Sequence, residues 1–360
     1  MHDFTGGGIH ALSSKRKSTG NPEVDEQIRQ LVASWGPTES PELVEQLVAS
    51  AYKVVRDKVN MADLKLFNRS LNELRNAARV FAPYREYRKV AVFGSARTRP
   101  EEPEFVAAEE FGRRMKDRGY MIVTGGGDGI MGAAQRGAGR ENSFGLNIRL
   151  PFEQRANEVI DGDPKLINFN YFFTRKLNFL KETHAIALFP GGFGTMDEGF
   201  EVLTLMQTGK ARLMPVVLVD KPGGKYWETW MSFLREHLLG LRLISENDFQ
   251  LFTVAADVDA AVEAVTHFYR NFRSYRWVGD RMVIRLIHAI SDRALREINR
   301  EFKDMLREGA IERTEPLNEE RNEPDLATLP RLILTPERRD FGRIRQLLNA
   351  INAAERLDEA

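Results

Sequence analysis

The sequence predicts an α/β protein in which a Rossmann-like, doubly wound parallel sheet carries helical N- and C-terminal extensions. Between residues 87 and 275, short apolar runs alternate with helical segments, as in a parallel sheet covered on both faces. Three of these runs lead directly into glycine-rich loops. Outside this region the apolar spacing is helical, so we expect no strands there.

Four segments follow from this reading. They are a flexible tail (1–20), a helical N-terminal extension (21–86), the Rossmann-like domain (87–275) and a helical C-terminal extension (276–360). The tail contains Lys15-Arg16-Lys17, which we interpret as a solvated basic cluster rather than a nucleic-acid contact.

The individual elements are read from apolar runs and from proline and glycine boundaries. The expected strands of the central domain are 89–93, 120–123, 144–148, 185–189 and 215–219. Its expected helices are 103–118, 133–138, 171–182, 227–238 and 258–272. In the extensions we expect helices after Ser40-Pro41 and over 61–80, 282–306 and 340–357.

Composition excludes several functions. The 360 residues include 52 Lys+Arg and 52 Asp+Glu, and this neutral balance gives no electrostatic case for nucleic-acid or membrane binding. Cysteine is absent, which excludes disulfides and thiolate chemistry. No run approaches the roughly 20 apolar residues of a membrane span. We therefore expect a cytoplasmic protein.

The most informative stretch is Pro190-Gly191-Gly192-Phe193-Gly194-Thr195-Met196-Asp197-Glu198, with Glu201 one turn later. It is preceded by an apolar run and followed by helical apolar spacing, which predicts a strand, a tight glycine loop and a helix. Glycines let backbone N–H groups approach a ligand, and the start of a helix attracts a phosphate. A capping box is the competing interpretation, because Thr195 and Glu198 have its spacing.

Two other glycine loops leave predicted strands at the same edge of the sheet: Gly94-Ser95-Ala96 and Gly125–Gly132. Gly127, Gly129 and Gly132 match the dinucleotide-binding pattern. However, the next strand ends in Asn147-Ile148-Arg149 and lacks the acid that would hold a ribose. These loops therefore favour a mononucleotide over NAD.

Arg175-Lys176 lies on the helix that precedes the motif strand. Exposed basic pairs are common on helices, so an exposed pair is one interpretation. The functional alternative is a guanidinium held near Glu198 and a nucleotide.

With Arg175-Lys176 fifteen residues before Pro190, and with the Gly125–Gly132 loop upstream, the motif resembles the Lonely Guy (LOG) family over residues 88 to 272. These phosphoribohydrolases release a free base from a nucleoside 5′-monophosphate and need no metal or other cofactor. The resemblance implies that Arg175 and Glu198 are the catalytic pair. It also implies substrate or phosphate contacts from Ser95, Gly126, Gly127, Lys176, Gly191, Gly192, Gly194, Thr195 and Glu201.

The resemblance has departures and alternatives. Phe172 and His184 stand where many members have Met and Asp, and we expect both to affect the base pocket. Members are commonly dimers or larger, so a homo-oligomer is expected, with the extensions as contact elements. A non-catalytic nucleotide sensor or carrier is the main alternative. A pyridoxal-phosphate decarboxylase would need a Schiff-base lysine, for which Lys176, Lys181 and Lys210 are available without an evident acidic partner.

Overall fold

A computed structural model describes residues 18–150 and 155–357. The described chain forms two compact units, residues 18–75 and residues from 76 onward. Most of the predicted flexible tail, including Lys15-Arg16-Lys17, lies outside the described residues. Within the described ranges, no helix is both long enough and apolar enough to cross a membrane.

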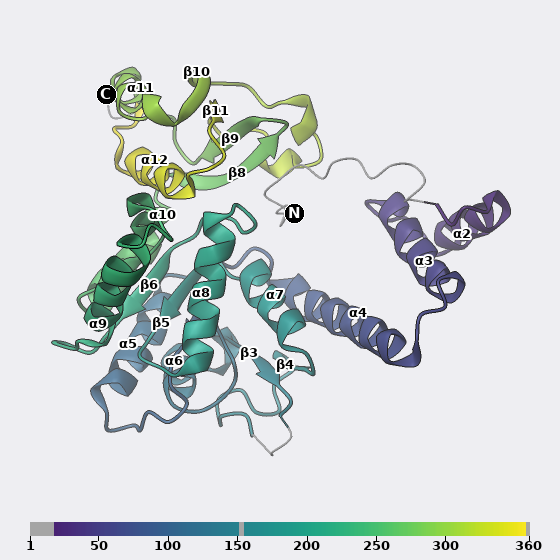
Figure 1. Ribbon diagram of the computed structural model, residues 1–360, viewed down its shortest axis with the longest axis horizontal. Coiled ribbons are helices and arrows are strands. Elements are labelled where there is room, and N and C mark those ends of the chain that lie inside the picture. Colours follow the sequence, from purple (N-terminus) through teal and green to yellow (C-terminus); the bar gives the residue numbers. More distant parts are fainter. Residues whose placement is uncertain (1–17, 151–154, 358–360) are drawn as a thin grey trace. The chain divides into compact units, whose positions relative to one another are not determined.

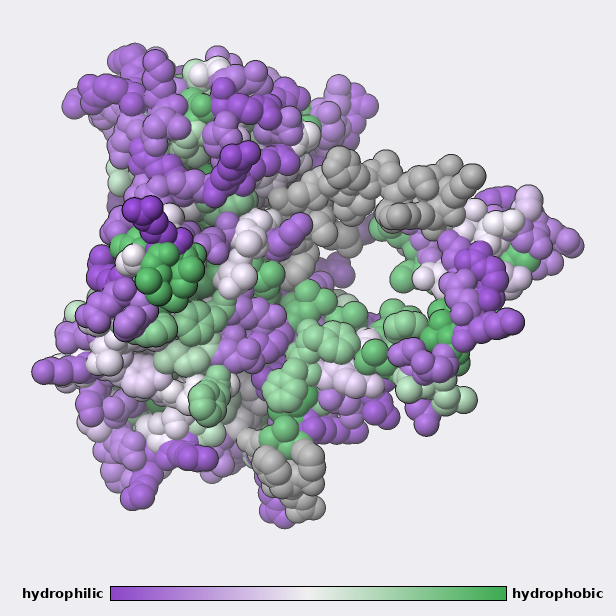
Figure 2. Space-filling model, viewed as in Figure 1, coloured by the Kyte–Doolittle hydropathy of each residue, from purple (hydrophilic) through white to green (hydrophobic). Residues whose placement is uncertain are grey.

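The first unit is helical, as predicted. It contains α2 (Pro22–Ser34), α3 (Pro41–Arg56) and the first part of α4 (Met61–Phe81). Asn21 begins α2 by accepting the N–H of Glu23, and Pro41 is the first residue of α3. Few side chains are buried here, whereas many large apolar side chains are exposed, as Figure 2 shows over these helices. The exposed ones include Trp35, Leu43, Leu47, Val55, Met61, Phe67 and Leu71.

The second unit is built on a seven-stranded parallel sheet with the order β4-β3-β2-β1-β5-β6-β7 (Figure 1). The strands are β1 (Lys89–Phe93), β2 (Met121–Thr124), β3 (Ser143–Ile148), β4 (Leu166–Phe169), β5 (Ala185–Leu188), β6 (Val216–Val219) and β7 (Thr253–Ala255). All five strands expected for this domain are confirmed. The edge strands β4 and β7 are additional, and their partly exposed residues explain why no apolar run marked them.

Helices cover both faces of the sheet, which confirms the doubly wound prediction. They are α5 (Pro103–Asp117), α6 (Ile130–Ala138), α7 (Phe172–Glu182), α8 (Phe193–Gln207), α9 (Tyr226–Phe233) and α10 (Val258–Phe268). Val90 and Val92 of β1 face the core under α5, α6 and α10, whereas Ala91 and Phe93 face the core under α7 and α8. This alternation follows from the period of two along a strand.

The order of the strands fixes where a ligand site can form. From β1 the chain proceeds outward through β2, β3 and β4, and then returns to β5 on the other side of β1. The boundary between β1 and β5 is therefore a topological switch point, where loops diverge beyond the carboxyl ends of the strands. The three predicted glycine loops follow β1, β2 and β5, which are neighbours in the sheet.

The prediction that residues 276–360 form a helical C-terminal extension is wrong. Four antiparallel strands form a second sheet there with the order β10-β11-β9-β8. The elements are β8 (Phe272–Val278), β9 (Arg281–Leu286), α11 (Asp292–Glu301), β10 (Leu306–Arg313), β11 (Arg331–Pro336) and α12 (Phe341–Ala353). Only α12 matches a predicted helix over most of its length. The expected boundary at residue 275 falls inside β8.

The error has a local cause. Apolar residues of 282–306 recur at spacings that also suit a helix, but residues 282–286 are one strand of a hairpin whose turn is Gly279-Asp280. Arg285 breaks the apolar run in sequence, yet its side chain is only 1% exposed because it pairs with Glu320 at 2.6 Å. Arg331 completes this buried ion cluster at 3.2 Å from Glu320.

The remaining elements are short helical turns. They are η1 (Ala82–Tyr84), η2 (Arg140–Asn142), η3 (Leu234–Leu239), η4 (Glu246–Leu251), η5 (Lys303–Met305), η6 (Asn318–Glu320) and η7 (Pro324–Leu326). α12 packs its buried face into the core shared by α7, α8 and the second sheet. The second sheet therefore belongs to the same compact unit as the parallel sheet.

Candidate nucleotide site at the carboxyl edge of the sheet

The three glycine loops meet through backbone hydrogen bonds. The N–H of Ser95, after β1, donates to the carbonyl of Pro190 at 3.0 Å. The carbonyl of Ser95 accepts the N–H of Ile130, the first residue of α6, also at 3.0 Å. Ser95 thus joins the loop after β2 to the loop after β5, and the predicted juxtaposition of the loops is confirmed.

The loop after β2 is held in one conformation. Gly126 has a φ of 78°, in the left-handed region that glycine adopts freely, and its N–H donates to Oγ1 of Thr124 at 2.9 Å. Nδ2 of buried Asn157 donates to the carbonyls of Gly126 and Gly127 at 3.1 and 2.9 Å. Nδ2 of Asn157 also lies 2.6 Å from Oε1 of Gln135 on α6.

The loop after β5 has its carbonyl groups occupied. Pro190 accepts from Ser95, Gly191 accepts from the hydroxyl of Tyr226 at 2.5 Å, and the carbonyl of Gly192 accepts the N–H groups of residues 195 and 196. Among the described residues, no acceptor engages the N–H groups of residues 191–194. A loop with bound carbonyls and available N–H groups at a helix start suits an anion.

The helix start excludes the capping-box interpretation. α8 begins at Phe193 with Gly192 as its N-cap, so Thr195 lies inside the first turn rather than at the cap. Thr195 is instead buried against Gly191, where an added Cβ would lie 2.1 Å from Oγ1 of Thr195. Gly191 is therefore required by close packing. Gly192 and Gly194 have open space where a Cβ would stand, which leaves their backbone accessible.

Arg175 of α7 and Glu198 of α8 form the predicted pair. Nη2 of Arg175 lies 3.2 Å from Oε1 of Glu198, and the two side chains are only 13% and 8% exposed. The guanidinium also lies over the rings of Phe172 and Phe179, at 5.1 and 5.7 Å from their centroids. Nε of Arg175 is buried without a hydrogen-bond partner among the described residues.

Burial controls the electrostatics of this pair. Burial raises the pKa of Glu198 above its ordinary value, despite the opposing influence of Arg175 and Lys176. Burial likewise lowers the pKa of the Arg175 guanidinium, and Glu198 opposes that shift. A carboxylate with a raised pKa beside a desolvated cation is typical of reactive sites as well as of buried ion pairs.

Lys176 is held by acids of α8 rather than exposed. Its Nζ lies 2.6 Å from Glu201, 2.8 Å from Asp197 and 3.8 Å from Glu198. Burial by itself would lower the pKa of Lys176, but bonds to Asp197 and Glu201 raise it overall. A Schiff-base lysine needs a neutral amine, so this environment disfavours the decarboxylase alternative. Lys181 and Lys210 are exposed, and Lys181 pairs with Glu182.

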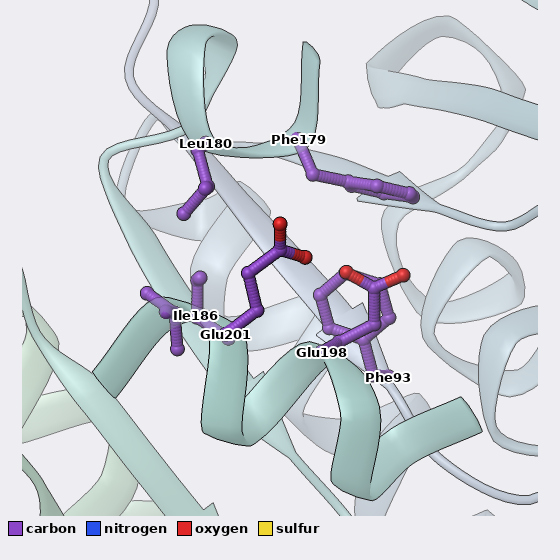
Figure 3. Close-up of a pocket in the computed structure, with 7 residues that line it drawn as sticks. Phe93, Phe179, Leu180, Ile186, Glu198 and Glu201 are labelled. Carbon is purple, nitrogen blue, oxygen red and sulfur yellow. The ribbon is translucent and has the colours of Figure 1, made fainter. Parts of the chain in front are cut away.

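A small cavity is lined in part by the acidic side chains of α8. It is lined by Phe93 of β1, Phe179 and Leu180 of α7, Ile186 of β5, and Glu198, Glu201 and Val202 of α8. In Figure 3 the carboxylates of Glu198 and Glu201 project from α8 toward Phe179 and Leu180. The mostly apolar lining explains why burial dominates the pKa of Glu198. The described residues contain no cluster of His, Asp and Glu that could hold a metal ion.

The two departures from the family pattern lie in different places. Phe172 is half exposed beside Arg175, where a change could reach a bound base. His184 precedes β5, at the amino end of the strand, where its Nδ1 accepts the N–H of Lys89. The expectation that His184 affects the base pocket is therefore wrong, because the loops leave the opposite end of β5.

Sequence reasoning missed several residues that shape the site. Asn157 and Gln135 hold the loop after β2, Asp197 binds Lys176, and Tyr226 binds the loop after β5. Asp197 lies within the motif and could have been considered. No spacing in the sequence signals Asn157, Gln135 or Tyr226, because the contacts that shape the site join residues more than 20 positions apart: Gln135 with Asn157, Asn157 with Gly126, and Tyr226 with Gly191.

Fold and site together define a Rossmann-like α/β protein with a glycine loop of available N–H groups and a buried Arg–Glu pair at the switch point. Residues 131–265 match a family model described as "Possible lysine decarboxylase". Curated relatives that match about two fifths of the chain carry the name of LOG phosphoribohydrolases. The predicted resemblance to the Lonely Guy family is confirmed.

Two of these relatives come from Oryza sativa subsp. japonica. The probable cytokinin riboside 5′-monophosphate phosphoribohydrolase LOGL5 is 29% identical over 153 residues, and the phosphoribohydrolase LOG is 30% identical over 152. The matches cover 41% of this chain and 59% and 60% of the relatives. The chain thus spans about 60% of the length of these curated relatives.

Solved structures also resemble this chain. The molybdenum cofactor carrier protein from Chlamydomonas reinhardtii is 24% identical, with a TM-score of 0.36, and covers 50% of this chain and 97% of its own. The molybdenum cofactor binding protein from Rippkaea orientalis is 18% identical, with a TM-score of 0.34, and covers 49% of this chain and 93% of its own.

Proposed function

We propose that this protein hydrolyses the N-glycosidic bond of a purine nucleoside 5′-monophosphate, AMP or an N6-modified AMP, to give the free base and ribose 5-phosphate. The observation that carries the proposal is the buried Arg175–Glu198 pair beside an anion-binding loop at the switch point. The names of the curated relatives support the same reaction class.

The anion-binding loop suits the 5′-phosphate. Its N–H groups at residues 191–194 and the start of α8 supply partial positive charge, and no acceptor among the described residues occupies these N–H groups. We propose phosphate contacts from Gly191, Gly192, Gly194 and Thr195. The loop after β2, with Gly126 and Gly127, and Ser95 after β1 line the same pocket. Binding the phosphate away from the reacting bond provides energy that positions the sugar.

Glu198 is the proposed reactive carboxylate. As the bond between C1′ and the base nitrogen breaks, its electron pair leaves with the base and positive charge develops on the ribose ring. A nearby carboxylate stabilises that charge and can accept a proton from the attacking water, as in glycoside hydrolysis. Water oxygen forms the new bond to C1′, and the base gains a proton.

Arg175 and Lys176 support this reaction without transferring the proton. A guanidinium is a poor acid, so we assign Arg175 to orienting Glu198 and balancing charge. Lys176 joins three acids of α8 and holds Glu201 in place at 2.6 Å. The proposed reaction uses no metal or redox cofactor.

The test is a product assay with purified protein. AMP, other 5′-monophosphates, isopentenyladenosine monophosphate and adenosine are incubated separately, and free base and ribose 5-phosphate are measured by chromatography. We expect cleavage of at least one purine monophosphate and much slower cleavage of adenosine, which lacks the phosphate. Tight AMP binding without any cleavage would instead support the sensor alternative. The expected homo-oligomer and cytoplasmic location stay predictions; sedimentation velocity tests the first.

A further inference from the structure

A tyrosine outside the predicted motif contacts the backbone of the anion-binding loop. Tyr226 is the first residue of α9, and its hydroxyl donates to the carbonyl of Gly191 at 2.5 Å. Gly191 lies 35 residues away in the sequence and belongs to the loop after β5. Among the described residues, no other side-chain hydroxyl donates to a carbonyl of residues 190–192.

Tyr226 is itself fixed by a carboxylate at the end of the neighbouring strand. Asp220 follows β6 and is buried, and its Oδ1 and Oδ2 accept the N–H groups of Lys221 and Tyr226, each at 2.9 Å. Gly224 permits this turn, because a Cβ there would lie 2.1 Å from Oδ1 of Asp220. Trp227 adds a bond from Nε1 to the carbonyl of Val219 at 3.1 Å.

The planarity of the peptide bond gives this contact a consequence for the ligand. The carbonyl of Gly191 and the N–H of Gly192 belong to one trans peptide and point in opposite directions. Holding the carbonyl toward Tyr226 therefore turns the N–H of Gly192 away from Tyr226. Without that bond, rotation of the peptide would present the carbonyl oxygen, which repels an anion.

The loop needs an external constraint because of its composition. Gly192 and Gly194 have no neighbouring atoms within 4 Å of an added Cβ, so packing does not limit their backbone rotation. Glycine also has the widest range of backbone conformations. The carbonyls of Pro190 and Gly192 are bound within the loop region, whereas that of Gly191 depends on Tyr226.

We propose that Tyr226 is a positioning residue, which orients the Gly191–Gly192 peptide so that the loop binds the phosphate of a nucleoside monophosphate. This inference rests on the proposed function for the identity of the ligand. Asp220 and Gly224 set the position of Tyr226 and form part of the same device.

The test compares Tyr226→Phe with a matched variant. Tyr269→Phe also removes a phenol that donates to a backbone carbonyl, that of His184 at 2.6 Å, but at the amino end of β5. Calorimetry measures the affinity of each protein for inorganic phosphate, ribose 5-phosphate, AMP and adenosine. Loss of one neutral hydrogen bond predicts a three- to tenfold weaker affinity, roughly, for the three phosphates in Tyr226→Phe. Adenosine affinity should not change, and Tyr269→Phe should match the wild type for every ligand.

Kinetics and a second variant complete the test. For Tyr226→Phe, kcat/KM for AMP should fall by the same factor as the phosphate affinity. Gly224→Ala, which displaces Asp220 without touching the loop, should reproduce the effect. Unchanged phosphate affinity in Tyr226→Phe, or an equal loss in Tyr269→Phe, would overturn the inference. If the wild type binds phosphates but cleaves no monophosphate, the proposed function fails, while the calorimetry still decides the role of Tyr226.

Discussion

Replacing Glu198 by Gln removes one negative charge while keeping the size of the side chain. The carboxamide oxygen can still accept the N–H of Arg175, now 3.2 Å from Oε1, so the geometry of the pair should persist. A carboxylate about 4 Å from the charge that develops on ribose, at an effective dielectric of about 20, contributes about 4 kcal/mol. That energy corresponds to a rate factor of about 10³. We therefore expect kcat for AMP to fall about 10²- to 10⁴-fold, the usual range for such a group.

Substrate affinity should survive this substitution, because the phosphate loop is unchanged. Initial rates of base release give kcat, and calorimetry on the inactive variant gives the AMP affinity, which should stay within about threefold of the wild type. Glu201→Gln is the matched control: Glu201 lies one turn later on α8 and binds Lys176 rather than Arg175. We expect a loss below about tenfold there. Turnover of Glu198→Gln within tenfold of the wild type would refute the role of Glu198.

Three other predictions follow from the contacts described. Burial raises the pKa of Glu198, and the negative charge of Glu201 raises it further. On acidification, kcat/KM should therefore begin to fall at a pH above 4.5, the ordinary pKa of a glutamate, and Glu201→Gln should shift this acid limb of the pH profile to lower pH. Gly191→Ala would bring a Cβ within 2.1 Å of Oγ1 of Thr195, so AMP affinity by calorimetry should fall at least about tenfold. Glu320→Gln would leave two buried arginines without their shared acid, and the free energy of unfolding in urea should fall by about 3 kcal/mol at neutral pH.

Each of these has an outcome that contradicts it. A pH limb that does not respond to Glu201→Gln would separate Glu201 from the titration of Glu198. Wild-type affinity in Gly191→Ala would mean that the loop does not hold the phosphate.

The pKa of Glu320 is lowered overall, because its hydrogen bonds and arginine partners outweigh burial. The stability that it contributes is thus present above its ordinary pKa and lost as pH falls through the lowered one. The gap between wild type and Glu320→Gln should narrow on acidification, and a constant gap would contradict the ion-pair account.

The sequence was sufficient for the five central strands of the parallel sheet, but not for the edge strands β4 and β7, because the central strands are continuous apolar runs. β1, for example, is buried at every position, and such runs alternate with helices of clear spacing. The second sheet was not predicted, because its strands carry charged residues whose partners come together only in the folded chain. Arg285 and Arg331 lie within strands and bind Glu320, which no local pattern predicts. Charged residues in β10, which is mostly exposed, conceal it in the same way.

In the candidate site, too, some residues could be predicted from the sequence and others could not. Arg175 and Glu198 were predicted from a motif resemblance, and the structure brings them within 3.2 Å. Their roles in binding and catalysis stay predictions. The residues that hold the loops could not be predicted, because Asn157 and Tyr226 bind backbone carbonyls, and a backbone group leaves no signature in the sequence. These contacts exist only once the sheet, in the order β3-β2-β1-β5-β6, brings the segments that follow its strands together.

The most direct measurement is the product balance of AMP cleavage. Purified wild-type protein and Glu198→Gln are incubated with AMP under the same conditions, and adenine and ribose 5-phosphate are quantified over time. We expect equal amounts of the two products from the wild type, and at least a hundredfold slower release from Glu198→Gln. If the wild type left AMP and every other purine monophosphate intact, the central claim would be contradicted. Equal rates in the two proteins would contradict the assignment of Glu198.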